Sequence, residues 1–240
     1  MSQKGTVSES PDPRWKDLYR LAGFSSLLMA AFILFAVVAY FIWPYKDDFI
    51  SMGNIFAVLQ TDRLAGLISL DLPMLLIAPI NILVFLALYV ALKRVNESYA
   101  LIALVSALIA VVLVIQCRPL AELTVLSDKY AVGTDAAEKM RYLAAGEALR
   151  SYMKGTAWII QTLFFMVAGL INCLLMLRTR FFSKATAWTG IIISFIGLGF
   201  FLPVIGILLL FLNTIGSIPW CLLVARDFFR LEQEIQTLPQ

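Results

Sequence analysis

Long apolar runs separated by short polar segments dominate the sequence. The first uncharged run covers residues 21–43. At 1.5 Å per residue, a helix of about 23 residues exceeds the roughly 30 Å thickness of a bilayer's hydrocarbon core. Similar runs follow at 72–92, 99–117, 156–177, 186–203 and 206–225. The pattern predicts an all-α, polytopic transmembrane bundle with about six transmembrane helices. We expect a single domain over residues 21–225, between a flexible cytoplasmic tail at 1–20 and a second cytoplasmic tail at 226–240.

The last two runs form one apolar block, residues 186–225, which is too long for one crossing and suits two crossings with a very tight link. Pro203 and Gly206 are the expected turn. Because residues 203–212 carry no charge, a re-entrant hairpin is the alternative arrangement.

Two segments between the runs mix polar and apolar residues. Residues 49–61 carry apolar side chains at helical spacing, which predicts an interfacial helix. Residues 118–154 hold six basic and five acidic residues, and Asp135 followed by Glu138 resembles a capping box. We therefore expect an extracytoplasmic amphipathic helix there, within the largest water-exposed segment.

Asp71 is the acidic residue that lies inside an apolar stretch. It precedes Leu72 and Pro73, a pattern typical of a helix start, so the favoured interpretation is a helix cap. Arg63, eight residues earlier, would neutralise the carboxylate if residues 63–70 are helical. The alternative is a role in ligand or proton binding, because an ionisable group in a membrane is costly unless it is used.

Amide and hydroxyl side chains also occur inside the apolar runs, at Asn81, Gln161, Asn172, Asn213 and Thr214. Such groups avoid lipid, so we expect them to face the bundle interior. Interhelical hydrogen bonds explain them most simply; the alternative is a shared cavity. The candidate ligand-binding residues are therefore Asp71, Arg63, Asn81, Gln161 and Asn213.

Small residues mark two runs and allow close helix approach. They are Ala103, Ser106, Ala107 and Ala110 in the third run, and Gly190, Ser194, Gly197 and Gly199 in the fifth. Packing within the chain is the favoured use, and a homo-oligomer face is the alternative. Trp158, Trp188 and Trp220 are interpreted as residues of the aromatic belt at the membrane surface.

The composition argues against several classes of function. Apolar residues make up 61% of the chain, and the net charge of +3 is scattered in short clusters, which argues against nucleic acid as a partner. The chain has no histidine, so histidine-dependent triads and histidine-ligated zinc are excluded. Cys117, Cys173 and Cys221 fit neither a disulfide framework nor a metal site. We expect no cofactor and no metal, and an enzyme is disfavoured.

The basic residues predict the orientation. With both ends inside, eleven of the nineteen Lys and Arg residues are cytoplasmic, and both short inner loops are basic. We therefore expect the N-terminus and the C-terminus in the cytoplasm.

Four segments resemble a bacterial membrane protein family catalogued as domain of unknown function 4386. They are RLAGFSSLLMA at 20–30, NIFAVLQTDRLAGLISLDLPMLL at 54–76, LYVALKRVNESYALIALV at 88–105 and LLMLRTRFFSKATAWTGI at 174–191. The resemblance implies a six-helix bundle in a bacterial cytoplasmic (inner) membrane, and it brings no substrate or catalytic residue.

Three functions are carried forward. The leading hypothesis is a non-enzymatic bundle that binds a lipid or another hydrophobic small molecule in its outer half. The second is a small-molecule transporter, although the two halves of the chain show no convincing repeat. The third is a structural or regulatory partner subunit.

Overall fold

The computed structural model describes residues 12–42 and 51–237, and within these ranges every regular element is a helix. The long helices are α1 (Lys16–Ile42), α4 (Leu72–Leu92), α5 (Glu97–Gln116), α8 (Thr156–Met176), α9 (Lys184–Leu198) and α10 (Gly206–Gln236). The shorter ones are η1 (Pro13–Trp15), α2 (Met52–Thr61), α3 (Arg63–Ser69), α6 (Leu120–Val132), α7 (Ala136–Met153) and η2 (Gly199–Phe201).

Side-chain caps fix where several helices begin. The Asn96 side chain accepts a hydrogen bond from the Tyr99 amide at 3.1 Å, and α5 starts there. Ser183 caps α9 through the Thr186 amide at 3.1 Å, and Asp135 caps α7 through the Ala137 amide at 3.1 Å. These caps satisfy amides that no helical carbonyl can reach, so the sequence sets the boundaries locally.

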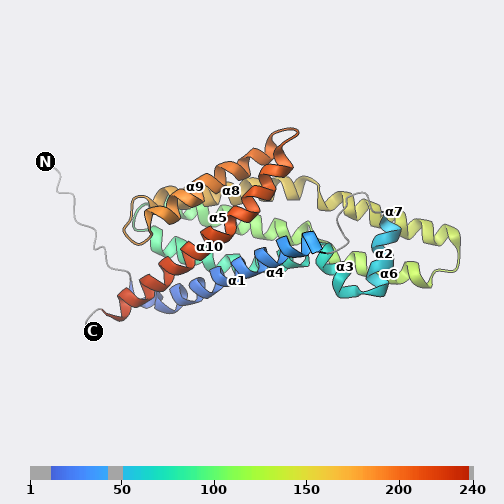
Figure 1. Cartoon of the computed structure of the whole chain (residues 1–240), viewed down its shortest axis with the longest axis horizontal. Coiled ribbons are helices and arrows are strands. Elements are labelled where there is room, and N and C mark those ends of the chain that lie inside the picture. The colour runs from blue at the N-terminus through green and yellow to red at the C-terminus, as the bar shows by residue number, and fades with distance from the viewer. Residues whose placement is uncertain (1–11, 43–50, 238–240) are drawn as a thin grey trace.

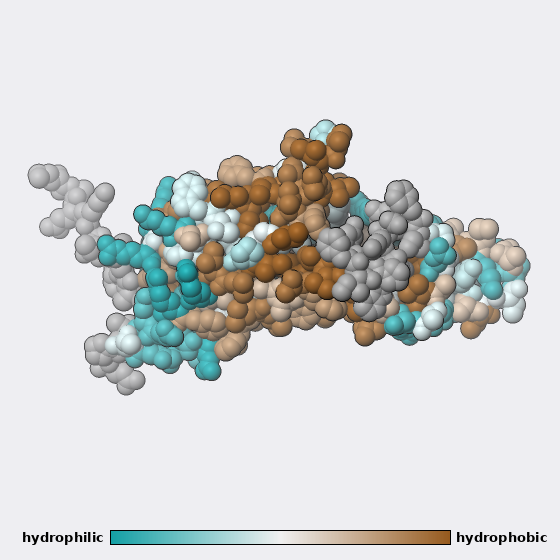
Figure 2. All heavy atoms as spheres, in the orientation of Figure 1, coloured by the Kyte–Doolittle hydropathy of each residue, from teal (hydrophilic) through white to brown (hydrophobic). Residues whose placement is uncertain are grey.

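Six helical stretches are long and apolar enough to cross a membrane, as expected of a multi-pass membrane protein. Figure 2 shows a broad apolar zone over the middle of the molecule, with hydrophilic residues gathered at one end and a more mixed surface at the other. Exposed Leu, Ile, Val and Phe side chains of this zone need hydrocarbon around them. The predicted all-α transmembrane bundle is confirmed.

The six long helices form a ring in which each packs on its neighbours in the chain, and α10 closes the ring by packing along α1. Figure 1 shows the start of α1 and the end of α10 at one end of the molecule, which we call the terminal end. The opposite end is called the distal end. There α2, α3, α6 and α7 form a separate projection beyond the bundle.

The distal projection has its own apolar core. Met52, Ile55, Phe56 and Leu59 of α2 are each at most 4% exposed and pack with Leu123 of α6. The segment predicted as an interfacial helix is thus helical, and its apolar face packs on α6 and α7. The sequence pattern could not predict this packing, because an amphipathic helix suits a membrane surface and a protein surface equally.

The hairpin of α9 and α10 turns at residues 202–205, where Pro203 and Gly206 were expected to make the link. Val204 adopts a left-handed backbone, with φ 72°, and its side chain is fully exposed at the tip. Both arms, with η2 completing the first, are long enough to cross a bilayer. The tip is apolar, so it belongs at or inside the membrane boundary, not in bulk water.

Parts of both predicted tail segments are helical. Residues 13–15 are a 3-10 helix and α1 begins at Lys16, so part of segment 1–20 is ordered helix. At the other end, α10 continues through residues 226–236, where a charged tail was expected. Phe228 and Leu231 are fully buried, and the Phe228 ring stacks on Tyr19 of α1 at 6.1 Å. This apolar face holds the helix on the bundle despite its charged opposite face.

The small residues serve packing within the chain, as predicted. Ala103, Ser106, Ala107 and Ala110 of α5 are all buried, and α5 packs on α4 and α8. Cys117, Cys173 and Cys221 are also buried, and they form no disulfide with one another.

Candidate functional site

A cavity of about 200 Å³ lies inside the ring of membrane helices. Side chains of α1, α4, α8, α9 and α10 line it. Its walls are mostly apolar, and include Met29, Ile77, Phe85, Phe165 and Met166. An engineered protein cavity of about 150 Å³ holds a benzene molecule, so this volume accommodates a ring or a small head group.

Three of the five candidate ligand-binding residues, Asn81, Gln161 and Asn213, line this cavity. They come from α4, α8 and α10 and are each at most 9% exposed. Asn213 Nδ2 donates to the Ile193 carbonyl of α9 at 2.8 Å, and Asn81 Nδ2 donates to the Ile77 carbonyl of its own helix at 3.1 Å. The fold therefore brings together amide groups that lie far apart in the sequence.

Glycines of α9 create the space beside these amides. A Cβ added at Gly197 would lie 2.1 Å from Met166 Sδ and 2.8 Å from Asn213 Nδ2. At Gly190 it would lie 2.3 Å from Cys173 Sγ and 2.5 Å from Trp220 Nε1. The absence of side chains at these positions is what lets α8 and α10 approach α9.

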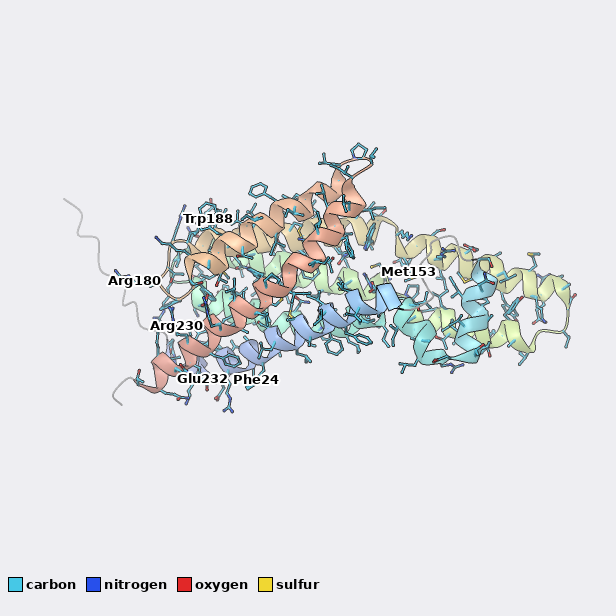
Figure 3. The ribbon with its side chains drawn as sticks, in the orientation of Figure 1. Phe24, Met153, Arg180, Trp188, Arg230 and Glu232 are labelled. Atoms are coloured by element: carbon cyan, nitrogen blue, oxygen red, sulfur yellow. The ribbon has the colours of Figure 1, made fainter. Side chains whose placement is uncertain are left out.

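Trp220 requires a correction, because it was interpreted as a membrane-belt residue. The indole instead lines the cavity, and Nε1 is buried. Trp188 does fit the belt interpretation, since it is 55% exposed and projects outward from α9 (Figure 3). Spacing alone could not tell an inward tryptophan from an outward one.

Asp71 and Arg63 lie outside the cavity lining, and they do not pair with each other. Asp71 Oδ2 accepts hydrogen bonds from Arg118, with 2.7 Å to Nη2 and 2.8 Å to Nε. Arg63 instead pairs with Asp128 of α6. The expected pairing was wrong because Arg63 opens α3, whereas Asp71 follows the other end of that helix in a left-handed backbone conformation, with φ 77°. Asp71 stands at the start of α4 without capping it.

The Arg118 guanidinium joins this start of α4 to the junction of α5 and α6. Its side chain is 6% exposed and also donates to the Val114 carbonyl at 3.3 Å. Desolvation against the protein raises the pKa of the Asp71 carboxyl, and the Arg118 charge opposes that rise. Sequence reasoning missed Arg118; the signal was its position between the apolar residues Cys117 and Pro119.

We expect Arg118→Ala to lower the free energy of unfolding by about 1–3 kcal/mol, because it leaves a half-buried carboxylate without its partner. Arg63→Ala is the matched control. Its pair with Asp128 is about half exposed on both sides, so the expected change is below roughly 1 kcal/mol. Thermal and denaturant unfolding in detergent micelles measures both, and equal losses would contradict the assignment of Arg118 as the partner.

A second buried acid, Asp227 of α10, was also missed. Its side chain is 0% exposed, and it accepts hydrogen bonds from the Ser183 amide at 2.9 Å and from Thr186 Oγ1 at 2.5 Å. Arg226 Nη2 lies 3.0 Å from its other oxygen. Arg180, Arg230 and Glu232 lie at this same terminal end (Figure 3). Asp227 therefore links α10 to the start of α9, although Ser183 and Thr186 lie more than 40 positions earlier in the chain.

The polar side chains of the cavity are amides, hydroxyls, thiols and an indole. Among the described residues that line it, none is charged. No group of three or more His, Cys, Asp or Glu side chains in residues 12–42 and 51–237 is arranged to hold a metal ion. Amides, hydroxyls and an indole in an apolar setting orient a ligand through hydrogen bonds.

Comparisons with protein-family models, with curated proteins and with solved structures found no match. The resemblance to domain of unknown function 4386 accordingly stays a prediction.

Proposed function

We propose that this chain binds an amphipathic or hydrophobic small molecule within its transmembrane bundle, as a non-enzymatic binding protein. The observation that carries the proposal is the cavity of about 200 Å³, in which apolar walls surround the side chains of Asn81, Gln161 and Asn213. Polar groups in a membrane interior are costly unless they have partners, and a cavity that they line is a natural place for a ligand with polar atoms. The site lies between the helices and does not include Asp71.

Access from the bilayer is part of the proposal. At the terminal end α1 and α10 are joined by aromatic contacts, including Phe24 with Phe229 at 5.1 Å. The two helices diverge toward the distal end (Figure 1), and both contribute residues to the cavity, Ile33 from α1 and Asn213 from α10 among them. A hydrocarbon tail would leave the cavity along this divergence and lie in lipid, so the ligand need not fit entirely within the protein.

We place the terminal end in the cytoplasm of a bacterium, with the distal projection outside. Support comes from Lys93, Arg94, Arg178 and Arg180, which follow the terminal ends of α4 and α8. Basic residues in short loops favour the cytoplasmic side. The bacterial cytoplasmic membrane itself rests on the family resemblance.

A transporter has less support than a binding protein. Transporter sites are typically built from discontinuous helices. Here α4 and α10 are continuous through Pro79 and Pro219.

Filling the cavity tests the proposal. Ser217 lines it, so Ser217→Phe places a ring where a ligand would lie. We expect mass spectrometry of the purified protein to find a hydrophobic molecule in the wild type that is reduced about tenfold in this variant. Leu222→Phe is the control, since Leu222 is 48% exposed on the same helix and should retain the molecule. Equal contents of every co-purifying molecule in the three proteins would refute a ligand in the cavity.

A further inference from the structure

The indole N–H of Trp220 faces no stronger acceptor than the Cys173 thiol at the cavity. Within residues 12–42 and 51–237, Nε1 of Trp220 is the one buried side-chain nitrogen or oxygen without a hydrogen-bond partner. An indole nitrogen can only donate, and leaving such a group buried and unpaired costs about 1–3 kcal/mol. A native protein tolerates this rarely, so the orphaned donor needs an explanation.

The surroundings of the indole show why no protein group satisfies it. Nε1 and Cys173 Sγ approach the same side of Gly190, where an added Cβ would lie within 2.5 Å of both atoms. A thiol sulfur is a weak acceptor and leaves the N–H in need of a better one. Any larger residue than glycine at position 190 would displace the indole, so the backbone of α9 holds the donor at the cavity wall.

The hydroxyl groups nearby are already committed to their own helices. Ser194 Oγ donates to the Gly190 carbonyl and Ser217 Oγ donates to the Asn213 carbonyl, each at 2.8 Å. Gln161 Nε2 donates to Thr162 Oγ1 at 3.3 Å. The amides of Asn81 and Gln161 each donate one of their two N–H groups in this way, whereas the single N–H of the indole has no good acceptor at all.

We infer that the cavity recognises an uncharged hydrophobic molecule through a carbonyl oxygen, which accepts a hydrogen bond from Trp220 Nε1. This inference rests on the proposed function and specifies its ligand. An anion would also accept the bond, but the described lining offers no Lys or Arg to neutralise it, and an isolated buried charge is far more costly than a neutral carbonyl. A hydrophobic body suits the apolar walls of the cavity.

Two kinds of membrane molecule present this chemistry. One is a quinone ring, whose carbonyl oxygens stand at the edge of a flat apolar body; the other is the ester carbonyl of a neutral glycerolipid. The probes are decylubiquinone for the first and dioctanoylglycerol for the second, each titrated by equilibrium dialysis against the full-length protein in lipid nanodiscs.

Trp220→Phe is the decisive variant, since it removes the N–H and keeps an aromatic ring. We expect it to weaken binding of the recognised probe about tenfold, which corresponds to about 1.4 kcal/mol. Trp188→Phe, on the lipid-facing side of α9, should bind like the wild type. The substitution removes a poorly paired donor and also part of the ring's packing, and these two effects oppose each other. The ligand-free Trp220→Phe protein should therefore melt close to the wild type, which separates lost recognition from lost folding.

The outcomes distinguish this inference from the proposed function. Weakened binding of either probe in Trp220→Phe supports the inference and identifies the source of the carbonyl. Unchanged binding in Trp220→Phe, together with loss in Ser217→Phe, overturns it and leaves a ligand in the cavity established. If Ser217→Phe abolishes the binding of neither probe, carbonyl recognition in the cavity is refuted. The proposed function is then tested by the mass spectrometry of the co-purified molecule.

Discussion

Asp227→Ala should lower the free energy of unfolding by about 3 kcal/mol, since it leaves the Ser183 amide and the Thr186 hydroxyl without their acceptor. The carboxylate is fully buried and joins α10 to the start of α9. Its loss should loosen the terminal end, where α10 also packs on α1. Denaturant titration in mixed detergent micelles measures the change.

Glu234→Ala is the control for that experiment on the same helix. Glu234 pairs with Arg230 one turn earlier, and both side chains are nearly half exposed, so the pair contributes about 0.5 kcal/mol or less. A loss in Asp227→Ala no larger than that of the control would show that the buried carboxylate does not hold the two helices together.

Gly206→Ala is the second substitution with a large expected effect. A Cβ at this position would lie 2.1 Å from the Phe200 carbonyl oxygen, and backbone on the other side of a tight turn cannot move aside as a flexible side chain can. We expect a loss of about 2–4 kcal/mol, or rearrangement of the hairpin tip.

Gly53→Ala provides the comparison, because its nearest neighbour atom would lie at an ordinary 3.7 Å within helix α2. There alanine should be neutral or should raise stability by about 0.5–1 kcal/mol through its higher helix propensity. The measurement is the melting temperature of each variant in the same detergent. Similar changes in Gly206→Ala and Gly53→Ala would rule out a steric requirement at position 206.

Local patterns were sufficient for most of the fold. Uncharged runs predicted the bounds of α4 and α8 almost to the residue. A helix that crosses a bilayer needs about 20 consecutive apolar residues, and such a run is visible in the sequence directly. The cap at Asp135 and the turn near Pro203 and Gly206 were also visible, since caps and turns depend on a few adjacent residues.

The sequence could not predict which helices pack against one another. The partner of Asp71 depends on where α5 ends in space, and Arg118 lies 47 positions away in the chain. The cavity depends on five helices converging, so Asn81, Gln161 and Asn213 could be proposed as inward-facing but not placed together. Asp227 looked like part of a charged tail, although Val224, Phe228 and Leu231 already marked an apolar face around it.

The closure of the ring by α10 against α1 has a consequence for biosynthesis. The ribosome delivers α10 after the other long helices, yet α10 supplies Asn213, Ser217 and Trp220 to the cavity wall. Contacts between the two ends of so long a chain are expected to form late in folding. We therefore expect the wall beside Asn81 and Gln161 to be completed only when α10 packs on α1, so a molecule from the surrounding lipid can enter the pocket before it closes.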